Sequence, residues 1–164
     1  VVSLIELENL QDVILCGHSY GGMVIAGASE RLAGRIKSLV FFDALVPANG
    51  DSVWSTFKEF GRERFIDASP DGLVTPAPPG VDARARAHPL ATFLQPVTLS
   101  DTAYAVSRKV YALCAKDFGS PFYHIHDRLA SDASWEVRKM DCGHDFMNEA
   151  PGLALDLMRD LLKG

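Results

Sequence analysis

The segment CGHSYGGM, residues 16–23, decides the fold that we expect for this chain. It lies between two apolar runs, DVILC at residues 12–16 and MVIAGA at residues 23–28. The first run is aliphatic and β-branched, which is typical of a buried strand, and the second has the apolar spacing of a helix. Glycines stand on both sides of the serine between them, so the sequence predicts a strand, a sharp turn and a helix.

Residues 17–21, Gly-His-Ser-Tyr-Gly, match the pattern G-x-S-x-G, which is known as the nucleophile elbow. In this motif a serine stands on a tight strand-to-helix turn, with its hydroxyl exposed at the top of the sheet. We expect a strained backbone at Ser19, and a steric collision for any side chain placed at Gly17 or Gly21. Gly22 would let the helix approach the sheet closely. The pattern makes Ser19 the candidate nucleophile.

Three further runs have the composition of strands, namely SLVFFDAL at 38–45, KVYALCAK at 109–116 and SWEVRKMD at 134–141. The runs at 12–19, 38–45 and 109–116 are apolar almost throughout, as parallel strands covered on both faces are. A crossover helix is expected between the first two strands, and a closing helix begins at Pro151. This alternation predicts an α/β fold with a mostly parallel sheet of about four strands.

The segment at 47–107 interrupts the alternation. Its middle, SPDGLVTPAPPG at residues 69–80, is rich in proline, which excludes a helix or a central strand. It is flanked by more large apolar side chains than a solvated linker carries, namely Trp54, Phe57, Phe60, Phe65, Phe93 and Leu94. We therefore predict a small helical lid at 47–107, inserted into a core formed by residues 1–46 and 108–164.

A serine hydroxyl is a weak nucleophile, so it needs a base within hydrogen-bond reach and a third group that orients the base. His144 follows the last expected strand on a glycine-containing loop, so its ring should hang over the same edge of the sheet as Ser19. His18 lies inside the elbow, and we expect it to point away from the site and to serve as a packing residue. His88 lies in the lid.

His124 and His126 form an H-x-H pair. In a strand they would share one face and could bind a metal, but no third ligand follows at a suitable spacing. We therefore expect a solvated helix at this point. The sequence predicts neither a metal site nor a cofactor.

In the nucleophile-elbow architecture, the acid follows the serine and precedes the histidine along the chain. Asp117 lies just beyond the third expected strand, where such an acid belongs, although a position before Gly119 also suits an ordinary turn aspartate. Asp43, at the end of the second strand, could also reach the histidine. We favour Asp117 as the acid, with Asp43 second and Asp127 third.

Composition limits the partners of the chain. It has 164 residues and a net charge of −5, and its 16 Lys and Arg residues are scattered. This pattern argues against nucleic acid or a membrane surface as the partner and favours a small neutral ligand. No apolar stretch approaches the length that spans a bilayer, and the first residues lack the pattern of a secretory signal, so we expect the cytosol. The widely spaced Cys16, Cys114 and Cys142 indicate buried, reduced thiols.

At these residues the chain resembles the α/β-hydrolase superfamily, and within it the small plant-type methylesterases, hydroxynitrile lyases and their bacterial esterase relatives. The resemblance is carried by residues 17–52, by KVYALCAKD at 109–117 and by DCGHDFMNEAP at 141–151. It implies Ser19 as the nucleophile, Asp117 as the orienting acid and His144 as the general acid and base.

The resemblance further implies that the backbone N–H of Tyr20 is half of an oxyanion hole. With the aromatic lid, it predicts a site for a small ester in which Tyr20, His18, Trp54 and Phe93 line the oxyanion or substrate position. The expected function is that of a serine hydrolase that cleaves small carboxylic esters through an acyl-enzyme intermediate.

Two other functions stay open on the same residues. One is a hydroxynitrile lyase, but the lyases of this group carry a lysine after the catalytic histidine, where this chain has Asp145. A carboxylate there would repel cyanide. The other is a binding protein without catalytic activity, which an intact set of serine, acid and histidine argues against.

Members of the resembling family begin with about four further strands, one of which precedes the loop of the second oxyanion donor. Without them, the strand at 12–19 has a bare apolar edge. We therefore expect the sequence to be a fragment of a longer protein, or a partner to cover this edge, for example a second copy in a homodimer. We expect the isolated fragment to be inactive.

Overall fold

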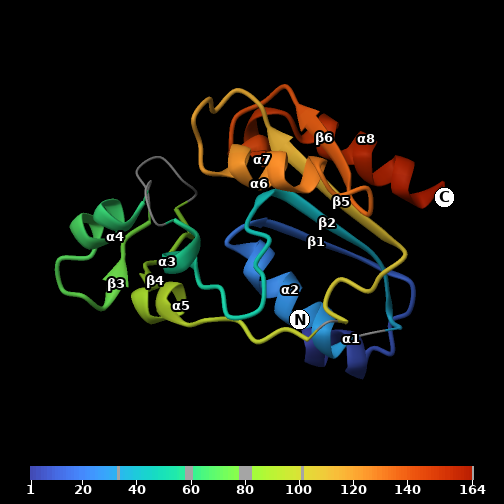
Figure 1. The fold of residues 1–164 in the computed structure, drawn as a ribbon, viewed down its shortest axis with the longest axis horizontal. Helices are drawn as coiled ribbons and strands as arrows, with labels where there is room; N and C mark the ends of the chain where they lie inside the picture. The colour runs from blue at the N-terminus through green and yellow to red at the C-terminus, as the bar shows by residue number, and fades with distance from the viewer. Residues whose placement is uncertain (33, 58–60, 78–82, 101, 164) are drawn as a thin grey trace. The chain divides into compact units, whose positions relative to one another are not determined.

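The computed structural model describes residues 1–32, 34–57, 61–77, 83–100 and 102–163 (Figure 1). It divides into a first unit, Val1–Val46 with Leu99–Gly164, and a second unit, Pro47–Thr98. Residues 99–107, which we assigned to the insertion, cluster with the first unit. Phe60, which we placed in the lid, lies outside the described residues.

The first unit alternates strands and helices as the sequence pattern predicts, and each strand begins and ends within two residues of the expected position. Its elements are α1 (Val2–Leu7), β1 (Val13–Ser19), α2 (Gly21–Arg31), β2 (Ile36–Ala44), β5 (Arg108–Cys114), α6 (Phe122–Ala130), β6 (Glu136–Met140), α7 (Phe146–Glu149) and α8 (Pro151–Leu162).

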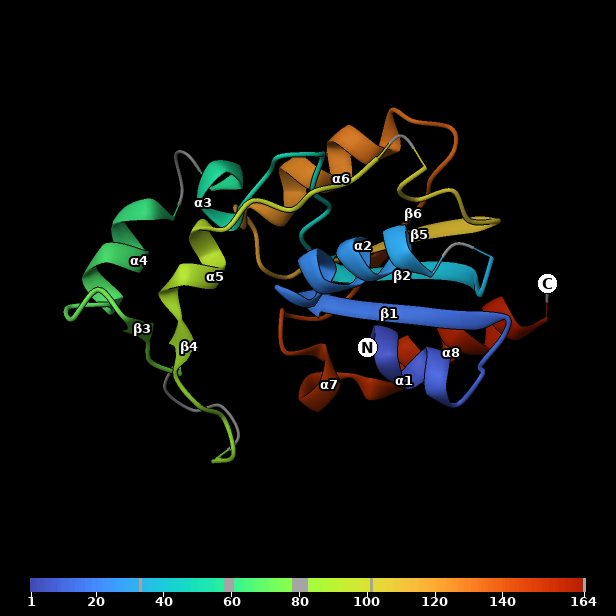
Figure 2. The ribbon, with the colours of Figure 1, turned by 90° about the horizontal axis from the view of Figure 1, so that it is seen from below.

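The four strands form one parallel sheet in the order β1-β2-β5-β6. Figure 2 shows α2 and α6 on one face of this sheet and α1 and α8 on the other. Alternate residues of β2 and β5 pack against the apolar stripe of α8 and form one half of the core with it. The strand residues are Val40, Phe42, Val110 and Ala112, and the helix residues are Ala154, Leu157 and Leu161. The chain therefore has the predicted α/β architecture with helices on both faces.

Parallel pairing brings the carboxyl ends of the strands to one edge of the sheet. Ser19 ends β1, and it pairs with Ala44 at the end of β2. The loop that carries Asp117 follows β5, and the loop that carries His144 follows β6. The topology thus gathers the serine, the candidate acids and the histidine at this edge.

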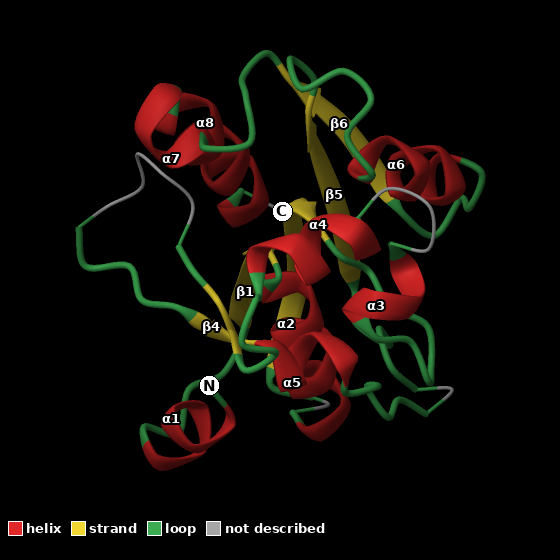
Figure 3. Ribbon diagram, turned by 90° about the vertical axis from the view of Figure 1, so that its left-hand side faces the viewer, coloured by secondary structure: helices red, strands yellow, loops and turns green. Residues whose placement is uncertain are grey.

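The second unit is a small helical body, as predicted for the insertion. It contains α3 (Val53–Thr56), α4 (Arg62–Ala68), α5 (Leu90–Leu94) and a short antiparallel pair, β3 (Val74–Thr75) with β4 (His88–Pro89) (Figure 3). Its aromatic side chains pack on one another, since the ring centroid of Phe65 lies 6.0 Å from that of Phe57 and 4.8 Å from that of Phe93. This mutual packing accounts for the large apolar residues around the proline-rich stretch.

The strand β1 lies at the edge of the sheet, with β2 as its hydrogen-bonded neighbour. We predicted that β1 is covered on both faces, but most of it is half-buried and Cys16 is exposed. The prediction of a buried Cys16 is therefore wrong, whereas Cys114 and Cys142 are buried and free, as expected. An edge strand of this composition presents unpaired backbone groups to other chains.

We expect this chain, purified alone, to self-associate through residues 13–19. A lysine at an edge position opposes strand pairing, so Cys16→Lys should shift the sedimentation profile towards monomer. The matched control is Leu162→Lys, at an exposed apolar position on α8, which should leave the profile unchanged. A monomeric wild-type chain at micromolar concentration would contradict the expectation.

Candidate active site

The turn between β1 and α2 has the steric properties of a nucleophile elbow. The backbone of Ser19 is left-handed, with φ of +54°, a conformation that residues other than glycine rarely adopt. A Cβ at Gly17 would lie 2.7 Å from the carbonyl oxygen of Gly21, and a Cβ at Gly22 would lie 1.9 Å from the carbonyl oxygen of Leu45. Both positions therefore require glycine, as the sequence analysis predicted.

Gly21 does not share this requirement. A Cβ at Gly21 meets no atom within 4 Å, so the predicted collision is wrong at this position. Gly21 is the first residue of α2, where the side chain projects away from the turn. The tight contact in the elbow comes from the backbone of Gly21, not from its missing side chain.

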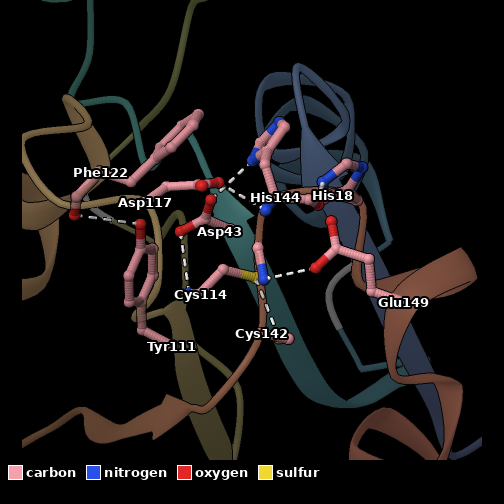
Figure 4. Close-up of polar contacts among 10 residues, drawn as sticks. His18, Asp43, Tyr111, Cys114, Asp117, Phe122, Cys142, His144 and Glu149 are labelled. Atoms are coloured by element: carbon pink, nitrogen blue, oxygen red, sulfur yellow. Dashed lines mark hydrogen bonds and ion pairs between the residues drawn. The ribbon is translucent and has the colours of Figure 1, made fainter. Parts of the chain in front are cut away.

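Asp43 holds the imidazole of His144. The Nδ1–H of His144 donates to Oδ2 of Asp43 at 2.6 Å, and the backbone N–H of Cys114 donates to Oδ1 at 3.1 Å (Figure 4). Asp43 is fully buried, and its backbone is left-handed, with φ of +42°. Strained backbone at two residues of one edge, Ser19 and Asp43, is typical of functional sites.

Asp117 binds the same histidine at a different atom. Its Oδ2 accepts the backbone N–H of His144 at 2.6 Å (Figure 4). Our preference for Asp117 over Asp43 as the acid on the ring therefore differs from the structure. The reason lies in the strand order, because β2 and β5 are neighbours and both end close to His144, and it is Asp43 whose carboxylate meets the ring. Asp127, the third candidate, pairs with His126 on α6 instead.

Two other rings pack against the ring of His144, whose side chain is partly exposed. Phe122 stacks on it with ring centroids 5.1 Å apart and planes 8° apart, and the ring of His18 lies 4.4 Å away on a tilted plane. Glu149 anchors the loop by accepting the backbone N–H of Gly143 at 2.8 Å. Sequence reasoning missed Phe122 and Glu149, because no motif or spacing in the sequence marks either residue.

His18 is a packing residue as expected, but the expectation that it points away from the site is wrong, because its ring lies beside that of His144. Its Nε2–H donates to the backbone carbonyl oxygen of His144 at 2.9 Å, and the ring of Phe146 meets it edge-on at 5.3 Å. Burial lowers the pKa of the His18 imidazole, and the neighbouring His144 lowers it further. His18 is therefore a neutral donor at neutral pH.

Ser19 is the residue next to His18, at the same edge of the sheet. Within the described residues, no hydrogen bond reaches the Ser19 hydroxyl. Because Nδ1 of His144 is bound to Asp43, Nε2 is the ring nitrogen that can face a hydroxyl. Tyr20 directly follows the serine and caps the N-terminus of α2.

The other residues considered for the site lie elsewhere. Trp54 and Phe93 belong to the second unit, where Trp54 lies under the guanidinium of Arg62 and Phe93 stacks on His88. Their contact with substrate stays a prediction. His124 and His126 lie on α6 as expected of a helix, but that helix is amphipathic rather than solvated, since His126 is buried.

No group of three or more His, Cys, Asp and Glu side chains among the described residues could hold a metal ion. No described helix combines the length and the apolar character that crossing a membrane requires.

Substitution of the two helical glycines should separate their roles. We expect Gly22→Ala to destabilise the fold severely, because the added methyl overlaps the backbone of Leu45. Gly21→Ala should be neutral or stabilising by about 0.5–1 kcal/mol, because alanine is the better helix former and nothing opposes it. Thermal unfolding followed by circular dichroism measures both, and equal melting temperatures for the two variants would contradict the steric assignment.

Comparison with known proteins is consistent with this geometry. The family model described as "Alpha/beta hydrolase family" matches residues 1–156. A carbendazim hydrolyzing esterase from Nocardioides sp. (strain SG-4G) is 35% identical over 173 residues, which is 92% of this chain and 72% of that protein.

Solved structures give the same fold. An extracellular alpha/beta-hydrolase from a Paenibacillus species superposes with a TM-score of 0.79 and 23% identity, over 96% of this chain and 74% of that one. A pyrethroid hydrolase from Sphingobium faniae superposes with a TM-score of 0.73 and 16% identity, over 99% of this chain and 75% of that one. The family match and the esterase relative show that this chain belongs to the α/β-hydrolase family.

Proposed function

We propose that this hydrolase cleaves small carboxylic esters through an acyl-enzyme formed on Ser19. The observation that carries the proposal is the 2.6 Å hydrogen bond between His144 and the buried Asp43, at the edge of the sheet where the elbow presents Ser19. An imidazole oriented by a buried carboxylate is the base that a serine nucleophile needs. The esterase relative supports ester hydrolysis at the level of the family.

In the proposed first half-reaction, Oγ of Ser19 attacks the ester carbonyl carbon while Nε2 of His144 takes the hydroxyl proton. Asp43 stabilises the resulting imidazolium through Nδ1–H. The tetrahedral intermediate then expels the alcohol, which takes the proton from Nε2, and the acyl group stays on Ser19. The hydrogen bond between Ser19 and His144 forms in this scheme with bound substrate, as is common for catalytic contacts.

In the second half-reaction, His144 removes a proton from water, which attacks the acyl-enzyme carbonyl. The acid is released and the proton returns to Ser19. The backbone N–H of Tyr20 donates to the oxyanion in both steps. A complete oxyanion hole includes a second donor, because the loss of one donor typically lowers the rate about 10²–10³-fold.

Hydroxynitrile lyase chemistry is disfavoured on the same residues. Asp145 directly follows His144, and its carboxylate accepts the side-chain N–H of Asn148 at 2.8 Å. A negative charge beside the base opposes the departure of a cyanide anion into this site. We therefore expect no release of cyanide from a cyanohydrin.

Labelling of the serine tests the proposal. We expect a protein that contains this chain together with a complete oxyanion hole to hydrolyse p-nitrophenyl acetate and to react with a fluorophosphonate at Ser19, because an activated serine attacks both carbonyl and phosphoryl centres. Ser19→Ala should abolish both reactions and keep the circular dichroism spectrum. Mass spectrometry locates the label. An unlabelled Ser19 in a folded protein that binds the ester without turnover would favour the non-catalytic binding protein.

A matched pair of substitutions tests which carboxylate serves the imidazole. Asp43→Asn removes the charge that stabilises the imidazolium, so we expect kcat to fall on the order of 10³–10⁴-fold. Asp117→Asn keeps an oxygen that can accept the backbone N–H of His144, so its kcat should fall far less. Steady-state kinetics on p-nitrophenyl acetate separate the two. A large loss in Asp117→Asn with a small loss in Asp43→Asn would reverse the assignment.

A further inference from the structure

Three hydrogen bonds hold His144 in the described structure, and each comes from a different part of the sheet. Asp43 on β2 binds the ring, and Asp117 in the loop after β5 binds the backbone N–H. His18 on β1 binds the backbone carbonyl. Of these three residues, His18 is the one on the strand that ends with Ser19.

The place of His18 on β1 has a mechanical consequence. Ser19 is fixed by the elbow, and His144 lies on a loop that follows β6, which is three strands away in the sheet. The bonds from Asp43 and Asp117 set the orientation of His144 relative to β2 and β5. The bond from His18 ties the backbone of His144 directly to the strand of the nucleophile (Figure 4).

The chemistry of His18 suits this task. Its Nε2 must carry the hydrogen, because a carbonyl oxygen accepts and cannot donate. The donor must also be uncharged, since His144 becomes positively charged in the proposed reaction and a second imidazolium 4.4 Å away would oppose this. Burial, which lowers the pKa of His18, favours the neutral ring. The ring of Phe146 also packs against His18, edge-on, with the ring centroids 5.3 Å apart.

We propose that His18 is a positioning residue, whose hydrogen bond to the backbone carbonyl of His144 sets the distance between the Ser19 hydroxyl and the imidazole. This inference rests on the proposed function for its catalytic consequence. His18 touches neither the substrate nor the reacting atoms in this role. It acts through His144, and a displacement of about 1 Å between reacting groups can cost about 10²-fold in rate.

The test compares two amides of different reach. In His18→Gln the side-chain N–H₂ reaches about the position of Nε2 and can donate to the carbonyl, whereas in His18→Asn it reaches only the position of Nδ1. We expect His18→Gln to recover most of the wild-type kcat. His18→Asn should lose up to about 10²-fold in kcat with a small change in KM, because ground-state binding is not affected.

Two further variants complete the series. His18→Phe keeps an aromatic ring against Phe146 and His144 but removes the donor, so it should behave like His18→Asn. His124→Asn, at an exposed position on α6, is the control for loss of a histidine and should keep the wild-type kcat. Equal kcat values for the Gln and Asn variants would overturn the positioning role. If His18 only packed, kcat would not depend on how far the amide group of its replacement extends.

Nitrogen-15 spectra of the histidine rings separate failure of this inference from failure of the proposed function. In His18→Asn and His18→Phe the His144 ring signals should shift and broaden, because His144 has lost one of its three hydrogen bonds. A wild-type protein that turns over no ester, but whose His144 signals respond in this way, would defeat the proposed function and retain the positioning role. Unchanged His144 signals in both variants would defeat the positioning role whatever the activity.

Discussion

The candidate site depends on one buried charge. The carboxylate of Asp43 has no exposed surface, and a carboxylate removed from water costs several kcal/mol unless donors compensate it. The structure supplies two donors, the ring N–H of His144 and the backbone N–H of Cys114. The first comes from the loop after β6 and the second from the last residue of β5. The fold therefore places a buried negative charge where it can stabilise a proton on His144.

Parallel strand order makes this arrangement accessible to a short chain. Because β1, β2, β5 and β6 all end at one edge, side chains that are far apart in the sequence meet there. The arrangement strains the backbone, since both Ser19 and Asp43 adopt left-handed conformations that the surrounding contacts must impose. Gly22 contributes by letting α2 lie against the chain that follows β2.

Much of this could be predicted from the sequence, because the relevant signals are local. The runs at 12–19 and 109–116 showed the strands, and two glycines around Ser19 showed the turn. The choice between Asp43 and Asp117 could not be predicted, because Asp43 lies at the end of β2, Asp117 lies just beyond β5, and only side-chain direction decides which carboxylate meets the ring. Stacking of Phe122 on His144 is likewise a tertiary contact that no spacing in the sequence encodes.

The side chains of Tyr111, Cys114 and Cys142 near Asp43 are neutral, so they do not balance its negative charge. Burial raises the pKa values of Tyr111 and Cys114, and the nearby charge of Asp43 raises both further. Burial also raises the pKa of Cys142, whose sulfur lies 3.7 Å from that of Cys114. These side chains therefore stay neutral at physiological pH. None of them supplies a positive charge. In the proposed reaction, the charge that balances Asp43 is therefore the proton that His144 takes from Ser19, and the carboxylate stabilises the imidazolium at that step.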